Sequence, residues 1–560
     1  MVLVIMTTLV LTGLYLFGKF GLSSSQKAEV IGLYTSLFTL IWGLLNIIYS
    51  YSGSSIMIGI IPRIFDTSFK EPLNNNISFN STGNDSLDYY LSNNLYKGMD
   101  IPLNKEEVIS SLQNATNSLK SFLDILTTPT HFDGLTIVFV LLTIIITPIA
   151  ILASEKKTEM IASLLVVEAL LIGAFVTYDF ITFYALFEAV LIPMFFLIGG
   201  KGSGLSIFRT GAAYRLFLYT LAGSVLMLLG IIILYLETGT LNWHLLVLKN
   251  LSLNSFNTTN TLILHTNTTY DLSNNVNSIS NLFTLSPALW IFPLIFVAFA
   301  VKVPMIPVHL WLPEAHTIAP TPGSMILAAL LLKLGGYGIL RWLLPVLPEA
   351  CHFYMPFVLV IATISTLYAC LTCLRQIDVK RIVAYSSIVH MNICIFSIFT
   401  YSSLAIKGAI FEMFSHGIIS TGMFFLIGVV YNRHDTRTLK YFRGLALTMP
   451  LFSAIMFIFI LANSAVPLTC GFIGEFIMLS GSLKTLPLLT IILTLATVVN
   501  AGYNIWLFNR MCFGGYSPYL TKSKDLTRKE FFVLAPLLLY ILILGIKPNL
   551  IFMFIENSIF

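Results

Sequence analysis

Runs of about twenty apolar residues recur along this chain, and they restrict it to one class of fold. A helix of that length spans the hydrocarbon core of a bilayer, which is about 30 Å thick. Counting the runs predicts an all-α integral membrane protein with about fourteen transmembrane helices. The predicted spans are 2–20, 28–49, 134–154, 159–176, 180–199, 213–236, 286–315, 323–344, 353–374, 380–400, 406–430, 448–481, 485–509 and 533–555.

The composition agrees with a membrane protein. Hydrophobic residues make up 56% of the 560 residues, charged residues only 10%, and the mean hydropathy is +0.86. An ordinary soluble domain carries about 25% charged residues. The net charge of +5 says little about nucleic acid, and its distribution over the loops matters more.

Basic residues concentrate in the odd-numbered loops between the predicted spans. By the positive-inside rule these loops lie on the inner side, and both termini then lie on the outer side. The short even-numbered loops hold almost none, apart from Lys407 and Lys484. The basic residues are Lys19, Lys27, Lys156, Lys157, Lys201, Arg209, Arg215, Arg375, Lys380, Arg381, Arg433, Arg437, Lys440, Arg443, Arg510, Lys522, Lys524, Arg528 and Lys529.

Two even-numbered loops are long and polar, at about 51–132 and 238–284. We interpret both as outer-side additions to a helical body. Their N-x-S/T sequons arise by chance in Asn-rich sequence and do not predict glycosylation. The sequons begin at Asn76, Asn80, Asn84, Asn114, Asn250, Asn257 and Asn267.

Four charged residues lie inside predicted helices: Glu188, Lys302, Lys333 and Glu475. On translocon-based scales, four unpaired charges at this depth cost on the order of 10 kcal/mol. Two ion pairs within a structural scaffold are one explanation. Buried ion pairs, however, stabilise a fold weakly compared with apolar packing. A row of titratable groups for proton transfer explains the cost better.

Two of these charges sit beside helix breakers. Pro304 and Pro307 follow Lys302, and Pro467 and Gly471 precede Glu475. Non-helical backbone at membrane depth is tolerated only inside protein or beside a wet cavity, and paired broken helices mark ion sites in transporters with inverted repeats. We therefore predict two inverted five-helix repeats, helices 4–8 and 9–13, with discontinuous helices 7 and 12.

The predicted domains follow from this pattern. Residues 1–155 form N-terminal membrane helices with the first long loop, 156–345 the first repeat with the second loop, 350–510 the second repeat, and 530–560 a C-terminal membrane helix.

Three more titratable residues lie within helices 10 and 11. His390 and His416 are candidates for a proton relay because imidazole titrates near neutral pH, although a membrane histidine often serves only as a helix-to-helix hydrogen bond. Glu412 lies one turn before His416 and is a weaker candidate: it could pair with that histidine or face an outer-side wet region.

Several other patterns predict no site. "GGKGSG" at 199–204 lacks the preceding strand of a phosphate loop, and "HLWLPEAH" lacks the helical spacing of a zinc motif. Cys370 and Cys373 lie in an apolar helix without a second pair, so we interpret them as core residues. We expect no metal or redox cofactor bound by this chain.

Four motifs in order resemble a known family. "VKVPMIPVHLWLPEAHTIAPTPGSMILAALLLKLGGYGILR" at 301–341 is followed by "DVKRIVAYSSIVHMN", "SHGIISTGMFFLIG" and "CGFIGEF". They are similar to subunit 4 of mitochondrial NADH:ubiquinone oxidoreductase (complex I), a family of antiporter-like proton-channel subunits. The resemblance covers about 155–515. Glu412 departs from it, since the family usually has an apolar residue there.

The resemblance implies a function and a site. The family's channel residues map onto Glu188, Lys302, Lys333 and Glu475, and its central polar axis onto His390 and His416. It implies proton translocation coupled to electron transfer from NADH to ubiquinone in other subunits, where FMN, iron–sulfur clusters and quinone reside. Neighbouring antiporter-like subunits, accessory outer-side subunits and lipids are the implied partners. The implied location is the mitochondrial inner membrane, with both termini on the intermembrane-space side.

Two other functions fit the same residues. A stand-alone cation/proton antiporter exchanges ions without NADH, and a membrane scaffold tolerates neutralisation of its buried ion pairs.

Overall fold

The computed structural model describes residues 35–36, 133–154, 158–249, 287–520 and 524–556. The predicted spans at 2–20 and 28–49 lie outside the described residues, apart from Thr35 and Ser36. So do the loop at 51–132, most of the loop at 238–284, and all seven sequons.

Helices account for the regular structure of the described residues, whose only β contacts are two isolated bridges. This confirms the all-α class. The helices are α6 (Gly134–Ala153), α7 (Thr158–Val176), α8 (Phe180–Ala189), α9 (Leu191–Lys201), α10 (Ser206–Thr238), α13 (Pro287–Lys302), α14 (Trp311–Ile318), α15 (Thr321–Ile326), α16 (Leu332–Gly338), α17 (Leu344–Val346), α18 (Pro348–Cys373), α19 (Val379–Phe399), α20 (Ser403–His434), α21 (Leu445–Thr448), α22 (Pro450–Asn463), α23 (Cys470–Leu483), α24 (Pro487–Cys512), α25 (Arg528–Ile546) and α26 (Asn549–Glu556). Two π-helical turns, η5 (Leu327–Leu331) and η6 (Ile339–Leu343), flank α16, and a short 3-10 turn, η7 (Leu439–Tyr441), follows α20.

Ten helical segments of the described residues are long and apolar enough to cross a membrane, and three apolar helices are shorter. The membrane class is therefore confirmed, while the total of fourteen spans stays a prediction. All described residues belong to one compact unit, 1–44 with 131–560. The domain boundaries and the inverted repeats also stay predictions.

One predicted span differs in detail from the structure. The sequence suggested a single helix over 533–555, but α25 ends at Ile546 and α26 begins at Asn549. Pro548 lies between them, and a proline restricts the residue before it to extended backbone. The polar start of α25 is a capping box formed by Thr527 and Glu530, which satisfies two backbone N–H groups.

The predicted spans 286–315 and 448–481, which the sequence predicts to be interrupted, each contain two short helices. Between α13 and α14 lie the non-helical residues 303–310, and between α22 and α23 lie residues 464–469. Lys302 is the last residue of α13, and Glu475 lies in the second turn of α23. That these are discontinuous transmembrane helices stays a prediction.

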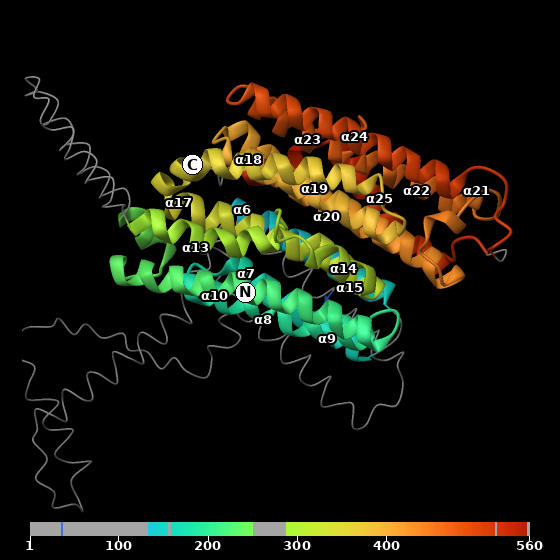
Figure 1. The fold of residues 1–560 in the computed structure, drawn as a ribbon, viewed down its shortest axis with the longest axis horizontal. Coiled ribbons are helices and arrows are strands. Elements are labelled where there is room, and N and C mark those ends of the chain that lie inside the picture. Colours follow the sequence, from blue (N-terminus) through green and yellow to red (C-terminus); the bar gives the residue numbers. More distant parts are fainter. Residues whose placement is uncertain (1–34, 37–132, 155–157, 250–286, 521–523, 557–560) are drawn as a thin grey trace, which may run out of the picture. The chain divides into compact units, whose positions relative to one another are not determined.

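The central helices are shielded from lipid. The membrane-length window of residues 321–346, and those of α19 and α20, are buried throughout, whereas only about a third of the α24 and α25 windows is buried. Figure 1 shows α19 and α20 side by side, and α20 also packs closely on α23. Polar groups on residues 321–346, α19 and α20 therefore face protein rather than hydrocarbon.

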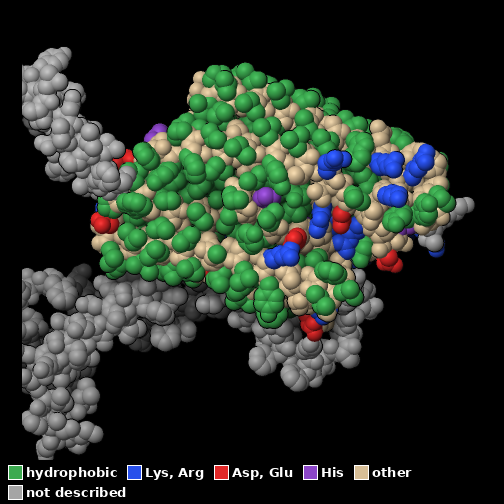
Figure 2. Space-filling model, in the orientation of Figure 1, with side chains coloured by type: hydrophobic (Ala, Val, Ile, Leu, Met, Phe, Trp, Pro, Cys, Tyr) green, Lys and Arg blue, Asp and Glu red, His purple; other side chains and the backbone are tan. Residues whose placement is uncertain are grey.

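Basic side chains gather at one end of the bundle. Figure 2 shows Lys and Arg concentrated where α14, α15 and α21 lie in Figure 1, while the rest of that face is largely apolar. This distribution agrees with basic loops on one side of a membrane.

Candidate functional site

Lys333 lies on α16, directly after the π-helical turn η5, and is completely buried. Its Nζ donates a hydrogen bond to the carbonyl oxygen of Ala328, at 2.7 Å. Nζ also lies 2.7 Å from Nδ1 of His416 on α20. A π-turn often occurs at a functional site. Here the π-turn directly precedes Lys333, whose ammonium group contacts a backbone carbonyl and an imidazole.

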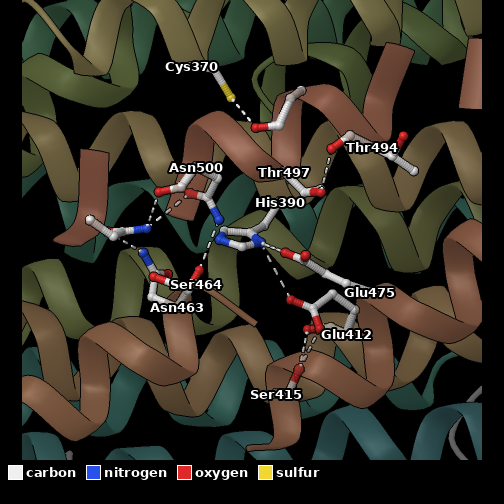
Figure 3. A network of polar contacts seen from close by, with 12 residues as sticks. Cys370, His390, Glu412, Ser415, Asn463, Ser464, Glu475, Thr494, Thr497 and Asn500 are labelled. Atoms are coloured by element: carbon white, nitrogen blue, oxygen red, sulfur yellow. Dashed lines mark hydrogen bonds and ion pairs between the residues drawn. The ribbon is translucent and has the colours of Figure 1, made fainter. Parts of the chain in front are cut away.

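His390 on α19 continues this row of polar groups. The centroids of the His390 and His416 rings are 5.4 Å apart. His390 Nδ1 lies 3.0 Å from Oε1 of Glu475 on α23 and 3.6 Å from Oε1 of Glu412 on α20. The contact with Glu475 has the length of an ion pair but not the alignment of a hydrogen bond. Figure 3 shows the two carboxylates directed toward His390 from two different helices.

Glu188 and Lys302 approach each other without forming an ion pair. Lys302 Nζ lies 3.4 Å from the carbonyl oxygen of Phe187, to which it donates, and 4.3 Å from the centroid of the Phe187 ring. Glu188, the next residue, interacts electrostatically with Lys302, and its Oε1 has no hydrogen-bond partner. The structure thus places Glu188 and Lys302 close together, and the lysine contacts the backbone beside the glutamate.

A glycine brings the Lys302 region close to the Lys333 helix. A Cβ on Gly335 would lie 2.8 Å from Val303 Cγ2 and 3.1 Å from Lys302 Cβ. Real Cβ atoms do not approach so closely, so only glycine lets the end of α13 pack on α16 at this point. The "KLGGYG" motif thus joins the two lysine-bearing helices.

Polar side chains satisfy the backbone at the first break. The amide N–H of Ile306 donates to Ser365 Oγ at 3.0 Å, and Asn392 Nδ2 donates to the carbonyl oxygen of Pro304 at 3.3 Å. Asn392 lies on α19, two residues after His390. Buried backbone groups in an apolar environment need such partners.

Three asparagines form hydrogen bonds at the second break, between α22 and α23. Asn500 Nδ2 donates to the carbonyl oxygen of Asn463, at the end of α22, and Asn463 Nδ2 donates to Asn504 Oδ1, both at 3.0 Å. Tyr503 donates to Asn500 Oδ1. These side chains are buried, and Figure 3 shows the hydrogen bond between Asn463 and Asn500.

The sequence interpretation missed these amides. The available signal was the occurrence of Asn392, Asn463, Asn500 and Asn504 inside otherwise apolar runs. A buried amide is costly unless it is hydrogen-bonded, so an asparagine at membrane depth indicates a partner. Only charged residues and histidines were counted, and the amides were overlooked.

A cavity of about 280 Å³ opens at the basic end of the bundle, and its lining includes Ser203, Lys380 and Arg437. Lys380 Nζ donates to the carbonyl oxygen of Ala319 at 2.7 Å, and Arg437 donates to that of Thr317. These cations cap the last carbonyls of α14, where a helix dipole favours positive charge.

The patterns set aside in the sequence contribute no shared site in the described residues. His316 is buried and stacks on Phe424 with ring centroids 4.5 Å apart, while His309 packs near Tyr368. All six cysteines are buried and free. Among the described residues, the one group of three that could share a cation is His390, Glu412 and Glu475.

The arrangement can pass protons. Lys333, His416, His390 and Glu475 form a row of titratable groups, all buried on the central helices and α23. The spacing along the helix leaves two alternatives for Glu412, a pair with His416 or a position facing an outer-side wet region. The structure instead places Glu412 against His390 and Ser415.

Comparison with known proteins gives one family. Residues 177–500 match the model of the transmembrane domain of NADH:quinone oxidoreductase and Mrp antiporters. The chain is 40% identical over 434 residues to NADH-ubiquinone oxidoreductase chain 4 of Marchantia polymorpha, covering 76% of this chain and 81% of the relative. It is 41% identical over 423 residues to the same-named protein of Arabidopsis thaliana, covering 74% and 79%.

Solved structures agree in fold. A chain of respiratory complex I from Thermus thermophilus superposes with a TM-score of 0.64 at 26% identity, covering 77% of this chain and 86% of that one. A chain of the Mrp complex from Dietzia sp. superposes with a TM-score of 0.66 at 16% identity, covering 76% and 83%. At that identity the second similarity shows the fold alone.

Proposed function

Because this chain belongs to the family of NADH-ubiquinone oxidoreductase chain 4, we propose that it is a membrane-arm subunit of a proton-pumping NADH:ubiquinone oxidoreductase. In this role it moves protons across the membrane while other subunits carry electrons from NADH to ubiquinone. The chain itself performs no redox chemistry.

One observation supports this proposal most strongly. A row of titratable groups runs from Lys333 through His416 and His390 to Glu475, with spacings of 2.7 Å between Nζ and Nδ1, 5.4 Å between ring centroids and 3.0 Å between Nδ1 and Oε1. Each of these side chains is buried in protein. Intramembrane ionisable residues are costly and mark proton relays.

The proton path follows this row. A proton enters from the inner side to Lys333, passes His416 and His390, and leaves by Glu475 toward the outer side, with Glu412 as an additional carboxyl beside the exit. Glu188 and Lys302 act as the coupling pair. Moving the Glu188 charge away from Lys302 removes the negative charge that favours the protonated lysine, so that lysine releases its proton onward.

The alternative is a stand-alone cation/proton antiporter. The similarity to the Mrp chain concerns fold alone, whereas the relatives at about 40% identity over three quarters of the chain carry the complex I subunit name. The redox-driven subunit is therefore favoured.

The setting follows from the same proposal. We place the chain in the mitochondrial inner membrane with both termini on the intermembrane-space side, next to other antiporter-like subunits, accessory outer-side subunits and lipids. FMN, iron–sulfur clusters and quinone belong to other subunits, and this chain holds no cofactor.

The test replaces the lysine in the centre of the path. Lys333→Met keeps the length of the side chain and removes its proton. We expect NADH-driven proton pumping in membrane vesicles to fall by on the order of a hundredfold, as for a positioned proton-transfer group. NADH oxidation with an artificial electron acceptor, which bypasses the membrane arm, should stay unchanged.

Lys407→Met is the matched control. Lys407 lies near the start of α20 and is part of a 3.8 Å ion pair with Glu556 outside the row. Both variants are first checked on a native gel stained for NADH dehydrogenase activity, where the chain should migrate in the large active complex. Full pumping in an assembled Lys333→Met complex would contradict the proposed function.

A further inference from the structure

We propose that Glu412 and Glu475 form a carboxyl pair that shares one proton beside His390, so that protons leave this chain from the pair and not from Glu475 alone. The inference rests on the proposed function. It assigns Glu412, which lies next to the exit residue, a direct part in proton release.

The pair is built by two tightly packed helices. Glu412 on α20 and Glu475 on α23 are 1% and 6% exposed, and one ligand atom from each lies within 4.8 Å of the other and of His390. A Cβ on Gly474 would lie only 2.3 Å from Glu412 Oε2. The missing side chain of Gly474 therefore makes the space in which the second carboxyl reaches the first.

The hydrogen bonds of the two carboxyls leave room for a proton. Glu412 Oε2 accepts a hydrogen bond from Ser415 Oγ at 2.9 Å, while Glu475 Oε1 has no hydrogen-bond partner. His390 lies near both carboxyls, and neither of its ring nitrogens has a hydrogen-bond partner. Buried polar atoms are almost always paired, and these atoms face one another at a separation at which they can share a proton.

The electrostatics favour one shared proton. Two carboxylates in one dry site cannot both stay ionised, because their repulsion adds to the cost of burial. The titratable groups that interact with Glu412 from the packed helices are Lys333 on α16, Cys394 and His390 on α19, and Cys470 and Glu475 on α23. With His390 protonated, a pair holding one proton makes the cluster of His390, Glu412 and Glu475 neutral overall.

This pair can release protons one at a time. The imidazolium of His390 gives its proton to the singly protonated pair, leaving a neutral imidazole and two neutral carboxyls. One carboxyl then releases a proton toward the outer side, and the remaining negative charge attracts the next proton onto His390. The site never holds two negative charges at once, which a low-dielectric interior strongly disfavours.

The experiment compares Glu412→Gln, Glu475→Gln and the double variant in the assembled complex. Gln keeps the size of each side chain and, at position 412, an oxygen for the Ser415 hydroxyl. We expect each single variant to retain pumping within about tenfold of wild type and the double variant to lose on the order of a hundredfold. The pH profile of pumping should show two separated steps in the wild type and one in each single variant.

Two further variants keep the result interpretable. Glu168→Gln is the matched control, because Glu168 is also a completely buried glutamate but lies on α7, which packs mainly on α6, α8 and α9. Glu412→Asp retains the carboxyl and should retain the two-step profile. If Glu412→Gln does not assemble, Glu475→Gln still tests the pair, because its residual pumping should show a single step.

The outcomes separate the inference from the function on which it rests. If Glu475→Gln alone loses as much pumping as the double variant, and Glu412→Gln pumps with the wild-type pH profile, the carboxyl pair is wrong and Glu475 acts alone. If Lys333→Met still pumps fully, the proposed function itself fails. Residual pumping in Glu475→Gln that disappears on adding Glu412→Gln supports the pair.

Discussion

At the scale of single residues, the structure explains why a lysine is tolerated in the middle of an apolar helix. Lys333 meets the Ala328 carbonyl and the His416 ring, so its charge is solvated by protein rather than by water. Glycines do comparable work nearby, since they allow backbones to approach where polar side chains must meet. Gly335 joins the two lysine helices, and Gly474 accommodates Glu412.

Gly474→Ala tests the close contact. The new methyl would lie 2.3 Å from Glu412 Oε2 and 2.8 Å from Glu412 Cβ, so the carboxyl must move. Overpacking of this kind costs about 1–3 kcal/mol, and we expect a lower temperature of disassembly together with reduced pumping. Gly502→Ala on α24 is the control, because nothing lies within 4 Å of its Cβ position. Equal stability of the two variants would refute the contact.

At the scale of elements, the two interrupted segments depend on side chains from other helices. The break after Lys302 is bonded by Ser365 and Asn392, and the break after Asn463 by Asn500. Non-helical backbone inside a bilayer survives only with such partners. The prolines thus interrupt the helices, and the asparagines and the serine stabilise the non-helical backbone by hydrogen bonds.

Asn500→Ala tests the second break. It removes the donor to the Asn463 carbonyl oxygen and leaves that buried acceptor unsatisfied, which costs about 1–3 kcal/mol. We expect a lower thermal stability of the assembled complex, measured as loss of the native-gel band after heating. Thr494→Ala is the control on the same helix, because its hydroxyl bonds only to the Ile491 carbonyl. A heated Asn500→Ala complex as stable as the control would show that the break does not depend on this amide.

At the scale of the whole molecule, a few long-range contacts tie distant segments together. Arg341 pairs with Asp133, 208 residues earlier, at 2.5 Å, and its guanidinium lies over the rings of Tyr178 and Trp243. Trp243 Nε1 donates to the Arg341 carbonyl oxygen at 2.7 Å. This group, formed by Asp133, Tyr178, Trp243 and Arg341, holds the start of α6 against the end of the Lys333 segment.

Asp133→Asn tests this tie. Arg341 is only 6% exposed at its side chain, so it would lose the Asp133 carboxylate while remaining buried. The Asp133 side chain is about a third exposed, and solvent therefore weakens the ion pair. We expect the variant to lower the free energy of unfolding by about 1–3 kcal/mol. Glu159→Gln, which breaks the more exposed pair with Lys201, is the control and should cost less than about 1 kcal/mol. The measurement is again the heating midpoint of the assembled complex, and a midpoint for Asp133→Asn no lower than that of the control would exclude a stabilising role for the pair.

Much of this molecule was predictable from its sequence. The apolar runs indicated the all-α membrane class, and the predicted spans within the described residues coincide with helices, apart from the non-helical residues 303–310 and 464–469 and the division of 533–555 into α25 and α26. The cost of charge in hydrocarbon singled out Glu188, Lys302, Lys333 and Glu475 without any structure. The motifs around them indicated the family that the comparisons confirm.

What only the tertiary structure decided is which of these groups meet. The central helices α19 and α20 are buried on all sides, so their sequences carry no apolar face that would tell one direction from another. In the structure, His390 faces Glu475, and Glu412 faces His390 instead of His416. These contacts depend on how closely the neighbouring helices approach, for example at Gly474. Length and hydropathy fix where a membrane helix lies along the chain, because lipid excludes polar groups, but its rotation is set by the close packing of neighbours.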